Sequence, residues 1–396
     1  MLKRPGFGYL PAPMTPGARQ TVDNDRPGTV DGFATRPTAA VATPPHDLTW
    51  HAGVRDRVLR AVDEFIDLVC AGSLSEGPVD IAETVLRSVL AEGKCLRSTF
   101  LYVGWRCGAA DSDAAIRAAA SLEFLHAFAL MQDDVMDGSP MRRGRPSAHR
   151  VFAGWHHSRG LSGSSARFGE SAAVLLGDLC LVWAEQMLRD SGLDDAALRR
   201  AWPRYDTMRT ELAVGQFADL VNDSAGFPSL DEVLDVARRK SGNYTVRRPL
   251  EIGAVLAGCP ERHLAALGTY GSAVGEAFQM RDDLLGVFGA PEITGKPAGD
   301  DLAARKATTV VAASYQLATD AQRRRLRAFM TAGHLTPADI THWQGLIAEV
   351  GTIEWIEELI ERRLNRAMDT LDIAGLDGDA HAALTAMAAA CARRVA

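Results

Sequence analysis

The chain has 396 residues, a formal net charge of −7 and 47% hydrophobic residues. Its length suits one large domain or two ordinary ones, and its hydrophobic content is sufficient for a substantial core. The acidic balance argues against a nucleic-acid partner, which would require a basic surface. The sequence contains no run of 18 or more apolar residues, so we expect no transmembrane segment. The N-terminus also lacks the apolar core of a signal peptide. The six scattered cysteines predict free thiols in a reducing, cytoplasmic location.

Two regions differ in composition. Residues 1–45 are rich in Pro, Gly, Thr and Ala without periodicity, and we interpret them as a disordered tail. In residues 46–396, which we expect to form a single domain, apolar residues recur at spacings of three and four, which predicts helices. These helices are Val54–Val69, Ile81–Leu90, Ser121–Met131, Ala172–Leu188, Leu212–Leu220, Leu230–Ala237, Leu264–Leu285 and Ile353–Leu371. The predicted fold class is all-α, a helical bundle around a central active-site cavity.

Two acidic clusters end two of these helices. The first is Asp133-Asp134-Val135-Met136-Asp137, and the second is Asp282-Asp283. On a helix, residues three or four apart share a face, so the carboxylates of the first cluster point the same way. Gly138 and Gly286 follow the clusters, which predicts that each helix stops there. Carboxylates at a helix C-terminus face the negative end of the dipole, so they require a cation such as Mg²⁺, which also binds phosphate oxygens.

Basic residues flank both acidic clusters. The basic segments are Gly93-Lys94-Cys95-Leu96-Arg97, Arg142-Arg143-Gly144-Arg145-Pro146, Thr294-Gly295-Lys296-Pro297 and Arg305-Lys306. Cations beside carboxylates suit phosphate groups that are neutralised both by metal and by direct contact. The sequence therefore predicts a metal–diphosphate site between two helices.

In this order, the motifs resemble those of the trans-isoprenyl diphosphate synthases of the polyprenyl synthetase family, most of all bacterial geranylgeranyl diphosphate synthases. The resemblance covers about residues 50–394. It also includes Leu125-His126, Leu176-Gly177-Asp178, Gly215-Gln216 with Asp219, Lys240, and Phe278-Gln279-Met280-Arg281-Asp282-Asp283. It implies an isoprenoid synthase fold and condensation of isopentenyl diphosphate with an allylic diphosphate (dimethylallyl, geranyl or farnesyl). It further implies three Mg²⁺ ions bound with the allylic diphosphate, and a homodimer.

The resemblance also implies roles for individual residues. The metal-site residues are Asp133, Asp134, Asp137, Asp282 and Asp283. The residues implied to bind isopentenyl diphosphate are Lys94, Arg97, His126 and Arg143. Those implied to bind the allylic diphosphate are Arg142, Lys240, Lys296 and Lys306. Gln279 lies near the reacting carbon. The segment after Lys240 is one residue longer than in many relatives, so either Ser241 or Thr245 supplies the hydroxyl near the cation. At Gly286 many relatives carry a third aspartate.

The residues before the first cluster imply a product length. Phe128 stands five positions upstream of Asp133 and Ala129 four positions upstream, and the cluster has no insertion. An aromatic followed by a small residue resembles one class of C20-producing enzymes, whereas two aromatics would favour C15, the product of farnesyl diphosphate synthases. The plainer interpretation is that Phe128 is an ordinary core residue.

Two rival functions follow from parts of the pattern. A class I terpene cyclase shares the helical fold and one acidic motif, but it binds no isopentenyl diphosphate and would leave Lys94, Arg97 and the Arg142–Pro146 segment without a role. A non-catalytic partner subunit should have lost ligands from the first acidic cluster, which is intact here. A product assay on the pure chain separates the three functions.

Overall fold

The structure is a computed structural model that describes residues 49–74, 80–91, 93–225, 228–290 and 298–392. The chain divides after Pro45 into two units, and everything below concerns the second, His46–Ala396. The predicted tail and Lys296 lie outside the described residues.

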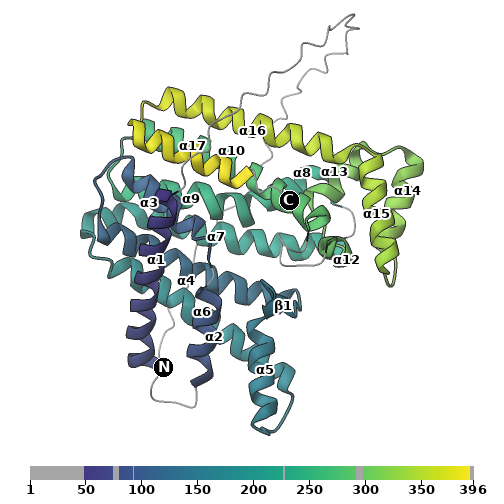
Figure 1. Ribbon diagram of the computed structural model, residues 1–396, viewed down its shortest axis with the longest axis horizontal. Coiled ribbons are helices and arrows are strands. Elements are labelled where there is room, and N and C mark those ends of the chain that lie inside the picture. The colour runs from purple at the N-terminus through teal and green to yellow at the C-terminus, as the bar shows by residue number, and fades with distance from the viewer. Residues whose placement is uncertain (1–48, 75–79, 92, 226–227, 291–297, 393–396) are drawn as a thin grey trace, which may run out of the picture. The chain divides into compact units, whose positions relative to one another are not determined.

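The described part of the chain is almost entirely helical (Figure 1). The N-terminal half contains α1 (Thr49–Val69), η1 (Cys70–Leu74), α2 (Asp80–Leu90), α3 (Leu96–Arg106), α4 (Asp113–Met136), α5 (Ala148–Ser158), α6 (Ser165–Arg189) and α7 (Asp195–Ala225). The C-terminal half contains α8 (Leu230–Ala237), η2 (Arg238–Arg247), α9 (Arg248–Leu256), α10 (Glu261–Phe288), α12 (Asp300–Ala303), α13 (Thr309–Leu317), α14 (Asp320–Thr331), α15 (Pro337–Glu349), α16 (Thr352–Ala374) and α17 (Gly378–Ala392). Two short strands, β1 (Met141–Arg142) and β2 (Arg145–Pro146), pair antiparallel. The all-α prediction is confirmed.

Helix α4 runs through the bundle and ends in the first acidic cluster. The Ser112 hydroxyl caps its first turn by accepting a hydrogen bond from the Ala115 amide. The helix packs on α1, α3 and α6, and this burial on several sides explains why apolar residues surround it. It ends as predicted, with Asp137 as its last cap residue and Gly138 in the left-handed region at φ 62°.

By length and composition, α4 and α6 are apolar enough to cross a membrane. In α4, 67% of the most apolar stretch is buried within the bundle, which marks it as a core helix. In α6 the share is 44%, because one face of this helix leaves Leu175, Leu179 and Val182 exposed.

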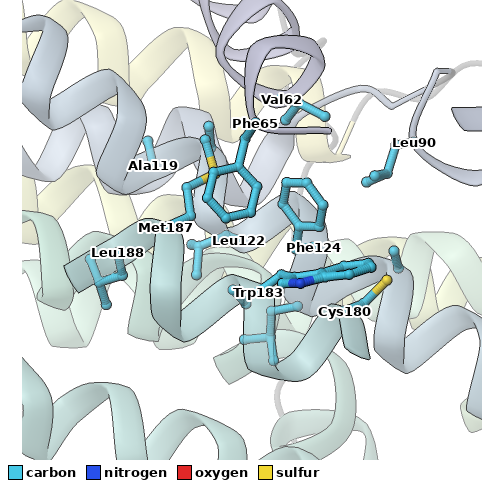
Figure 2. Packing of buried hydrophobic residues seen from close by; sticks show 14 of the residues in the cluster. Val62, Phe65, Leu90, Ala119, Leu122, Phe124, Cys180, Trp183, Met187 and Leu188 are labelled. Atoms are coloured by element: carbon cyan, nitrogen blue, oxygen red, sulfur yellow. The ribbon is translucent and has the colours of Figure 1, made fainter. Parts of the chain in front are cut away.

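Three aromatic rings pack against one another in the core around α4 (Figure 2). Phe124 meets Phe65 of α1 at a ring-centroid distance of 5.2 Å and Trp183 of α6 at 6.5 Å, both edge to face. Phe124 is fully buried. It lies nine residues before Asp133, roughly 13 Å along the helix axis, so this cluster is a rigid base for the site above it.

Glycines allow η2 to lie directly against its neighbours. A Cβ on Gly275 of α10 would lie 2.6 Å from the Gly242 carbonyl oxygen, and one on Gly215 of α7 would lie 2.7 Å from the Lys240 amide nitrogen. Both positions therefore require the absence of a side chain. As a result, Lys240 is held against α7.

The structure corrects the predicted end of the second acidic helix. Helix α10 continues past Gly286 to Phe288, and the Gly289 amide still donates to the Leu285 carbonyl. Gly286 has no positive φ and does not terminate the helix. Its lack of a side chain serves a contact with Asp301 instead, described below.

Candidate active site

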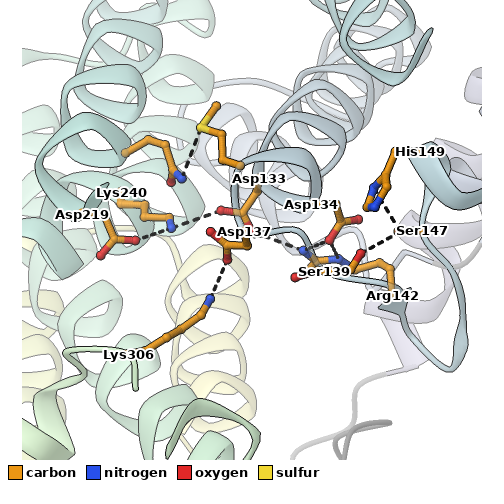
Figure 3. Close-up of polar contacts among 12 residues, drawn as sticks. Asp133, Asp134, Asp137, Ser139, Arg142, Ser147, His149, Asp219, Lys240 and Lys306 are labelled. Atoms are coloured by element: carbon orange, nitrogen blue, oxygen red, sulfur yellow. Dashed lines mark hydrogen bonds and ion pairs between the residues drawn. The ribbon is translucent and has the colours of Figure 1, made fainter. Parts of the chain in front are cut away.

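The first acidic cluster is neutralised by three cations that come from three different segments (Figure 3). The Lys240 ammonium donates to Asp133 Oδ1 at 3.2 Å, and Arg142 Nη2 donates to Asp133 Oδ2, also at 3.2 Å. Arg142 Nε further donates to Asp134 Oδ1 at 2.9 Å, and Lys306 Nζ donates to Asp137 Oδ2 at 2.7 Å. The fold thus brings together the first acidic motif and three of the predicted phosphate-binding cations.

Electrostatics differ between neighbouring carboxylates. Burial opposes ionisation of Asp133, but the charges of Lys240, Arg142 and Lys306 outweigh it and lower the pKa of Asp133. Asp134 is more deeply placed in protein, and there burial outweighs Arg142 and raises the pKa of Asp134. The two neighbouring carboxylates thus differ in environment: Asp133 is surrounded by cations, while Asp134 anchors Arg142.

The second acidic pair presents one exposed and one buried carboxylate. Asp282 is exposed, whereas Asp283 is buried. Asp283 Oδ1 accepts from Gln279 Nε2 at 2.7 Å, and its Oδ2 accepts from the Thr309 amide at 2.8 Å. Burial raises the pKa of Asp283 to about 7 in spite of these hydrogen bonds. Asp283 therefore ties α10 to α13 and orients Gln279, and Asp282 is the carboxylate that faces outward.

Asp301 fills the space beside Gly286. A Cβ built on Gly286 would overlap the Asp301 carboxylate. The charge of Asp301 raises the pKa of both Asp283 and Lys306, which shows that the carboxylate lies within electrostatic range of both. This residue was not predicted as part of the site, although the letters Asp300-Asp301 stand between Lys296 and Lys306. The glycine that departs from the family pattern thus makes room for a carboxylate from α12.

The donor set fits a hard divalent ion. Within the described residues, no three His, Cys, Asp or Glu side chains already converge as metal ligands. The carboxylates at the end of α4 instead hold lysine and arginine. On α10, Asp283 accepts from Gln279 and the Thr309 amide, and Asp282 faces outward. Mg²⁺ needs only one or two protein carboxylates from each side, with water and phosphate oxygens completing its octahedron. Oxygen donors without thiols or imidazoles are the set that such an ion prefers.

A second group of polar side chains has buried atoms without partners. The Arg97 guanidinium lies 4.4 Å from the centroid of the Tyr244 ring, and its Nε is buried without a hydrogen bond. The Nδ1 atom of His126 is likewise buried and unpaired. Burial, and then the charges of Arg97, Arg143 and Arg142, place the pKa of His126 well below its usual value. Buried polar atoms without partners are costly, so this arrangement indicates a ligand with acceptor oxygens.

The hairpin β1–β2 presents Arg143. Arg143 and Gly144 form its two-residue turn, both with positive φ, 52° and 73°. Such turns match the twist of paired strands, and they point their central side chains outward. Lys94 is also exposed, just before α3. Both cations lie at the surface, next to the segments that carry Arg97 and Arg142.

The segment that contains Lys240, Ser241 and Thr245 is π-helical. Segment η2 is π-helical over ten residues, Arg238–Arg247, and such segments accommodate an inserted residue inside a helix. Thr245 is fully buried, and its Oγ1 has no hydrogen-bond partner. Ser241 is partly exposed. The wider helical turn places residues five apart near one face, so Thr245 follows Lys240 on the same side.

The two predicted chain-length residues, Phe128 and Ala129, are partly buried and pack at the edge of the core. Phe124 and Leu125, predicted to lie deeper, are fully buried. Along α4, counting back from the acidic cluster, Phe128 comes first and the fully buried Phe124 comes one turn further on.

Comparison with known proteins gives the class of the chain. The polyprenyl synthetase family profile matches residues 79–346, and the chain belongs to that family. Its family and its relatives make it a short-chain trans-prenyltransferase.

Three relatives are particularly similar. The chain is 34% identical to a (2E,6E)-farnesyl diphosphate synthase and 31% identical to a geranylgeranyl diphosphate synthase, both of Mycobacterium tuberculosis. These alignments cover 72% and 71% of this chain and 75% of each relative. The third is the crystal structure of geranylgeranyl pyrophosphate synthase from Corynebacterium glutamicum complexed with isoprenyl diphosphate and magnesium. It superposes with a TM-score of 0.81 at 36% identity, covering 88% of this chain and 99% of that chain.

Proposed function

We propose that the chain condenses isopentenyl diphosphate with allylic diphosphates in a Mg²⁺-dependent reaction and yields mainly the C20 product, geranylgeranyl diphosphate. The observation that carries the proposal is the pairing of Asp133 with Lys240 and Arg142, beside two buried nitrogen atoms without a hydrogen-bond partner, Arg97 Nε and His126 Nδ1. Two neighbouring diphosphate sites, one acidic and metal-ready and the other basic, are what the reaction needs.

At the allylic site, Lys240, Lys306 and Arg142 neutralise the departing diphosphate. Each now donates to a carboxylate, and each can exchange that partner for a phosphate oxygen. Mg²⁺, when bound by Asp133, Asp137 and Asp282, supplies further charge stabilisation for the leaving group. We propose that Asp301 supplies the carboxylate that many relatives carry as an aspartate at the position of Gly286.

At the second site, Arg97, Arg143, His126 and Lys94 hold isopentenyl diphosphate. His126 is neutral, so it contributes a directional hydrogen bond without adding charge. The unpaired Thr245 hydroxyl and the Gln279 side-chain oxygen offer lone pairs to the carbocation that forms between the two sites. We assign the hydroxyl role to Thr245 because its Oγ1 is buried and has no other partner.

We propose the C20 product from the two residues predicted to limit the length of the prenyl chain, Phe128 and Ala129. Phe128 stands one turn before the closely packed Phe124 on α4, and the neighbouring Ala129 has only a small side chain. Relatives named for C15 and C20 products match this chain at similar identity, so the product assay decides between them.

We propose a homodimer that covers the exposed faces of α6 and α7. Leu175 and Val182 of α6 are 64% and 60% exposed, and Phe217 of α7 is 71% exposed. Large apolar side chains gathered on two neighbouring helices are typical of subunit interfaces. All six cysteines are free thiols, as predicted, which is compatible with the cytoplasmic location that we propose.

The test is a product assay on the pure full-length chain. The chain is incubated with Mg²⁺, labelled isopentenyl diphosphate and each of the dimethylallyl, geranyl and farnesyl primers. We expect a C20 prenyl diphosphate from each primer. A C15 end product would replace the C20 assignment with farnesyl diphosphate synthesis. Hydrocarbon products would indicate a cyclase, and the absence of any product would contradict the proposal.

A further inference from the structure

An arginine-rich hollow lies along α10, on the side of its N-terminal turns, with a volume of about 660 Å³. It is bordered by residues of α7, η2, α9 and α16, and its α10 wall runs from Glu261 to Glu276. None of its lining residues belongs to the acidic site or to the basic group around His126. The proposed reaction therefore gives this hollow no role.

The lining of the hollow has a positive balance. Six arginines and three glutamates line it, a formal excess of three positive charges in a chain whose net charge is −7. Glu211 and Asp235, outside the lining, pair with Arg248 and Arg238 and offset part of this excess. The arginines are Arg204, Arg238, Arg247, Arg248, Arg363 and Arg366. A concave surface of one sign concentrates ions of the opposite sign, so this hollow attracts anions in spite of the acidic surroundings.

Two glutamates hold four of the arginines in place. Glu251 accepts from Arg247 Nε at 2.8 Å and from Arg248 Nη1 at 2.7 Å. Gly268 lets the Glu251 carboxylate lie against α10, because a Cβ there would be 2.8 Å from Glu251 Oε1. Arg248 also donates to Glu211 from Nε at 2.9 Å and from Nη2 at 2.6 Å, so carboxylates engage all three of its nitrogens. These ion pairs orient the guanidinium groups along the wall.

Glu276, further along α10, also binds two arginines of the hollow. Its carboxylate accepts from Arg238 Nε at 3.1 Å and from Arg363 Nε at 2.6 Å. These contacts bring η2 and α16 to the same stretch of α10, so the walls of the hollow are fixed by ion pairs.

The remaining two arginines have open guanidinium groups. Arg204 of α7 and Arg366 of α16 make no side-chain hydrogen bond or ion pair with any described residue. They come from two different helices and both line the hollow. Ten N–H donors on planar forks of fixed geometry, about five on each group, match the oxygens of a phosphate or diphosphate.

We propose that this hollow is a second anion site, which binds a small oligophosphate with a diphosphate group as its minimal unit. Alkyl lining is limited to Leu264, Ala265 and Ala273, which offers no wall for a long prenyl tail. The ligand is therefore recognised through phosphate oxygens alone. The site is separate from catalysis, and a compact inorganic or nucleotide-type oligophosphate fits it better than the enzyme's own prenyl products.

The test measures binding of inorganic diphosphate to the full chain by equilibrium dialysis in EDTA. The double variant Arg204→Ala/Arg366→Ala breaks no observed ion pair, so it should fold, and its thermal unfolding is compared with that of the parent. The matched control is Arg324→Ala, an exposed arginine on α14 outside the hollow. In a second set of dialysis measurements, a prenyl diphosphate replaces inorganic diphosphate as the ligand.

We expect the double variant to lose about one diphosphate site per chain, or to weaken that site by at least about tenfold, because charge-assisted hydrogen bonds to arginine contribute this much each. The control should bind like the parent, and diphosphate soaked into crystals should lie against Arg204 and Arg366. Equal binding by parent and double variant would overturn the proposal, as would a site that accepts the prenyl diphosphate but not inorganic diphosphate.

Discussion

Lys240 Nζ lies 3.2 Å from Asp133 Oδ1, although 107 residues separate the two in the sequence. The same ammonium donates to Asp219 at 2.6 Å. Burial opposes the charge on Lys240, but the two carboxylates outweigh it and raise the pKa of the ammonium group. Lys240 therefore stays charged at the site and has a second carboxylate to retain when Asp133 binds a metal.

This arrangement predicts the outcome of removing Asp133. Asp133→Ala should lower turnover by several orders of magnitude and weaken Mg²⁺ binding, while Asp219 keeps Lys240 in place and the fold survives. Turnover, calorimetric Mg²⁺ titration and thermal unfolding are measured on the same variant. Asp369→Ala on α16, an exposed aspartate far along the sequence from the site, is the control. Near-normal turnover in Asp133→Ala would contradict the metal assignment.

The contact between Gly286 and Asp301 predicts a non-additive pair of substitutions. Gly286→Ala should displace the Asp301 carboxylate and reduce both Mg²⁺ affinity and turnover. Asp301→Ala should have a similar effect, because it removes the same carboxylate. The double variant should be no worse than either single one, since the overlap and the carboxylate are then both gone. Calorimetric Mg²⁺ titration of the four proteins measures this, and fully additive losses would show that the two residues act separately.

Phe128 and Phe124 predict different results when each is replaced by alanine. Phe128→Ala should lengthen the products beyond C20, at a modest cost in stability because the side chain is only partly buried. Phe124→Ala should cost about 3–5 kcal/mol, because the ring is fully buried between Phe65 and Trp183. Product chromatography and urea unfolding separate the two effects. Unchanged products from a folded Phe128→Ala enzyme would make Phe128 an ordinary core residue.

The raised pKa of Asp283 predicts a pH dependence of stability in the metal-free protein. Between the ordinary aspartate pKa, about 4, and about 7, the folded state holds a proton that the unfolded state has released. Stability from this group therefore falls as the pH rises through this range, by at most about 1.4 kcal/mol per pH unit, and levels off above about 7. Urea unfolding in EDTA from pH 4 to 8 should show this slope, and Asp283→Asn should flatten it. The same slope in Asp283→Asn would assign it to another group.

The exposed face of α6 predicts a dimer that a single charge can break. Val182→Glu should convert the protein to monomers, because it would bury an unpaired carboxylate at the proposed interface. Ile373→Glu on α16, where the isoleucine is 86% exposed and away from that face, should leave the assembly unchanged. Light scattering after size exclusion measures the mass. A monomeric parent protein would rule out the proposed homodimer.

Local pattern was sufficient for several features of this protein. Apolar spacing predicted the helices α4, α6 and α10, because a helix buried on one side must repeat its apolar residues with its own turn. Gly138 marked the end of α4 correctly, since it adopts the positive φ that glycine allows. The order of acidic and basic motifs also indicated the family, because the chemistry of two diphosphates demands those residue types.

Only the tertiary structure decided which charges meet. Lys240, Arg142 and Lys306 come from distant segments, and no local pattern specifies that they converge on the end of α4. We predicted a helix end at Gly286 because glycine often ends helices. The structure shows instead that a residue without a side chain is needed there, because the Asp301 carboxylate of another helix occupies the space. The arginine hollow likewise exists only because packing brings α7, η2, α9 and α16 around α10. Spacing along a helix determines which side chains share a face, but long-range packing determines what that face meets.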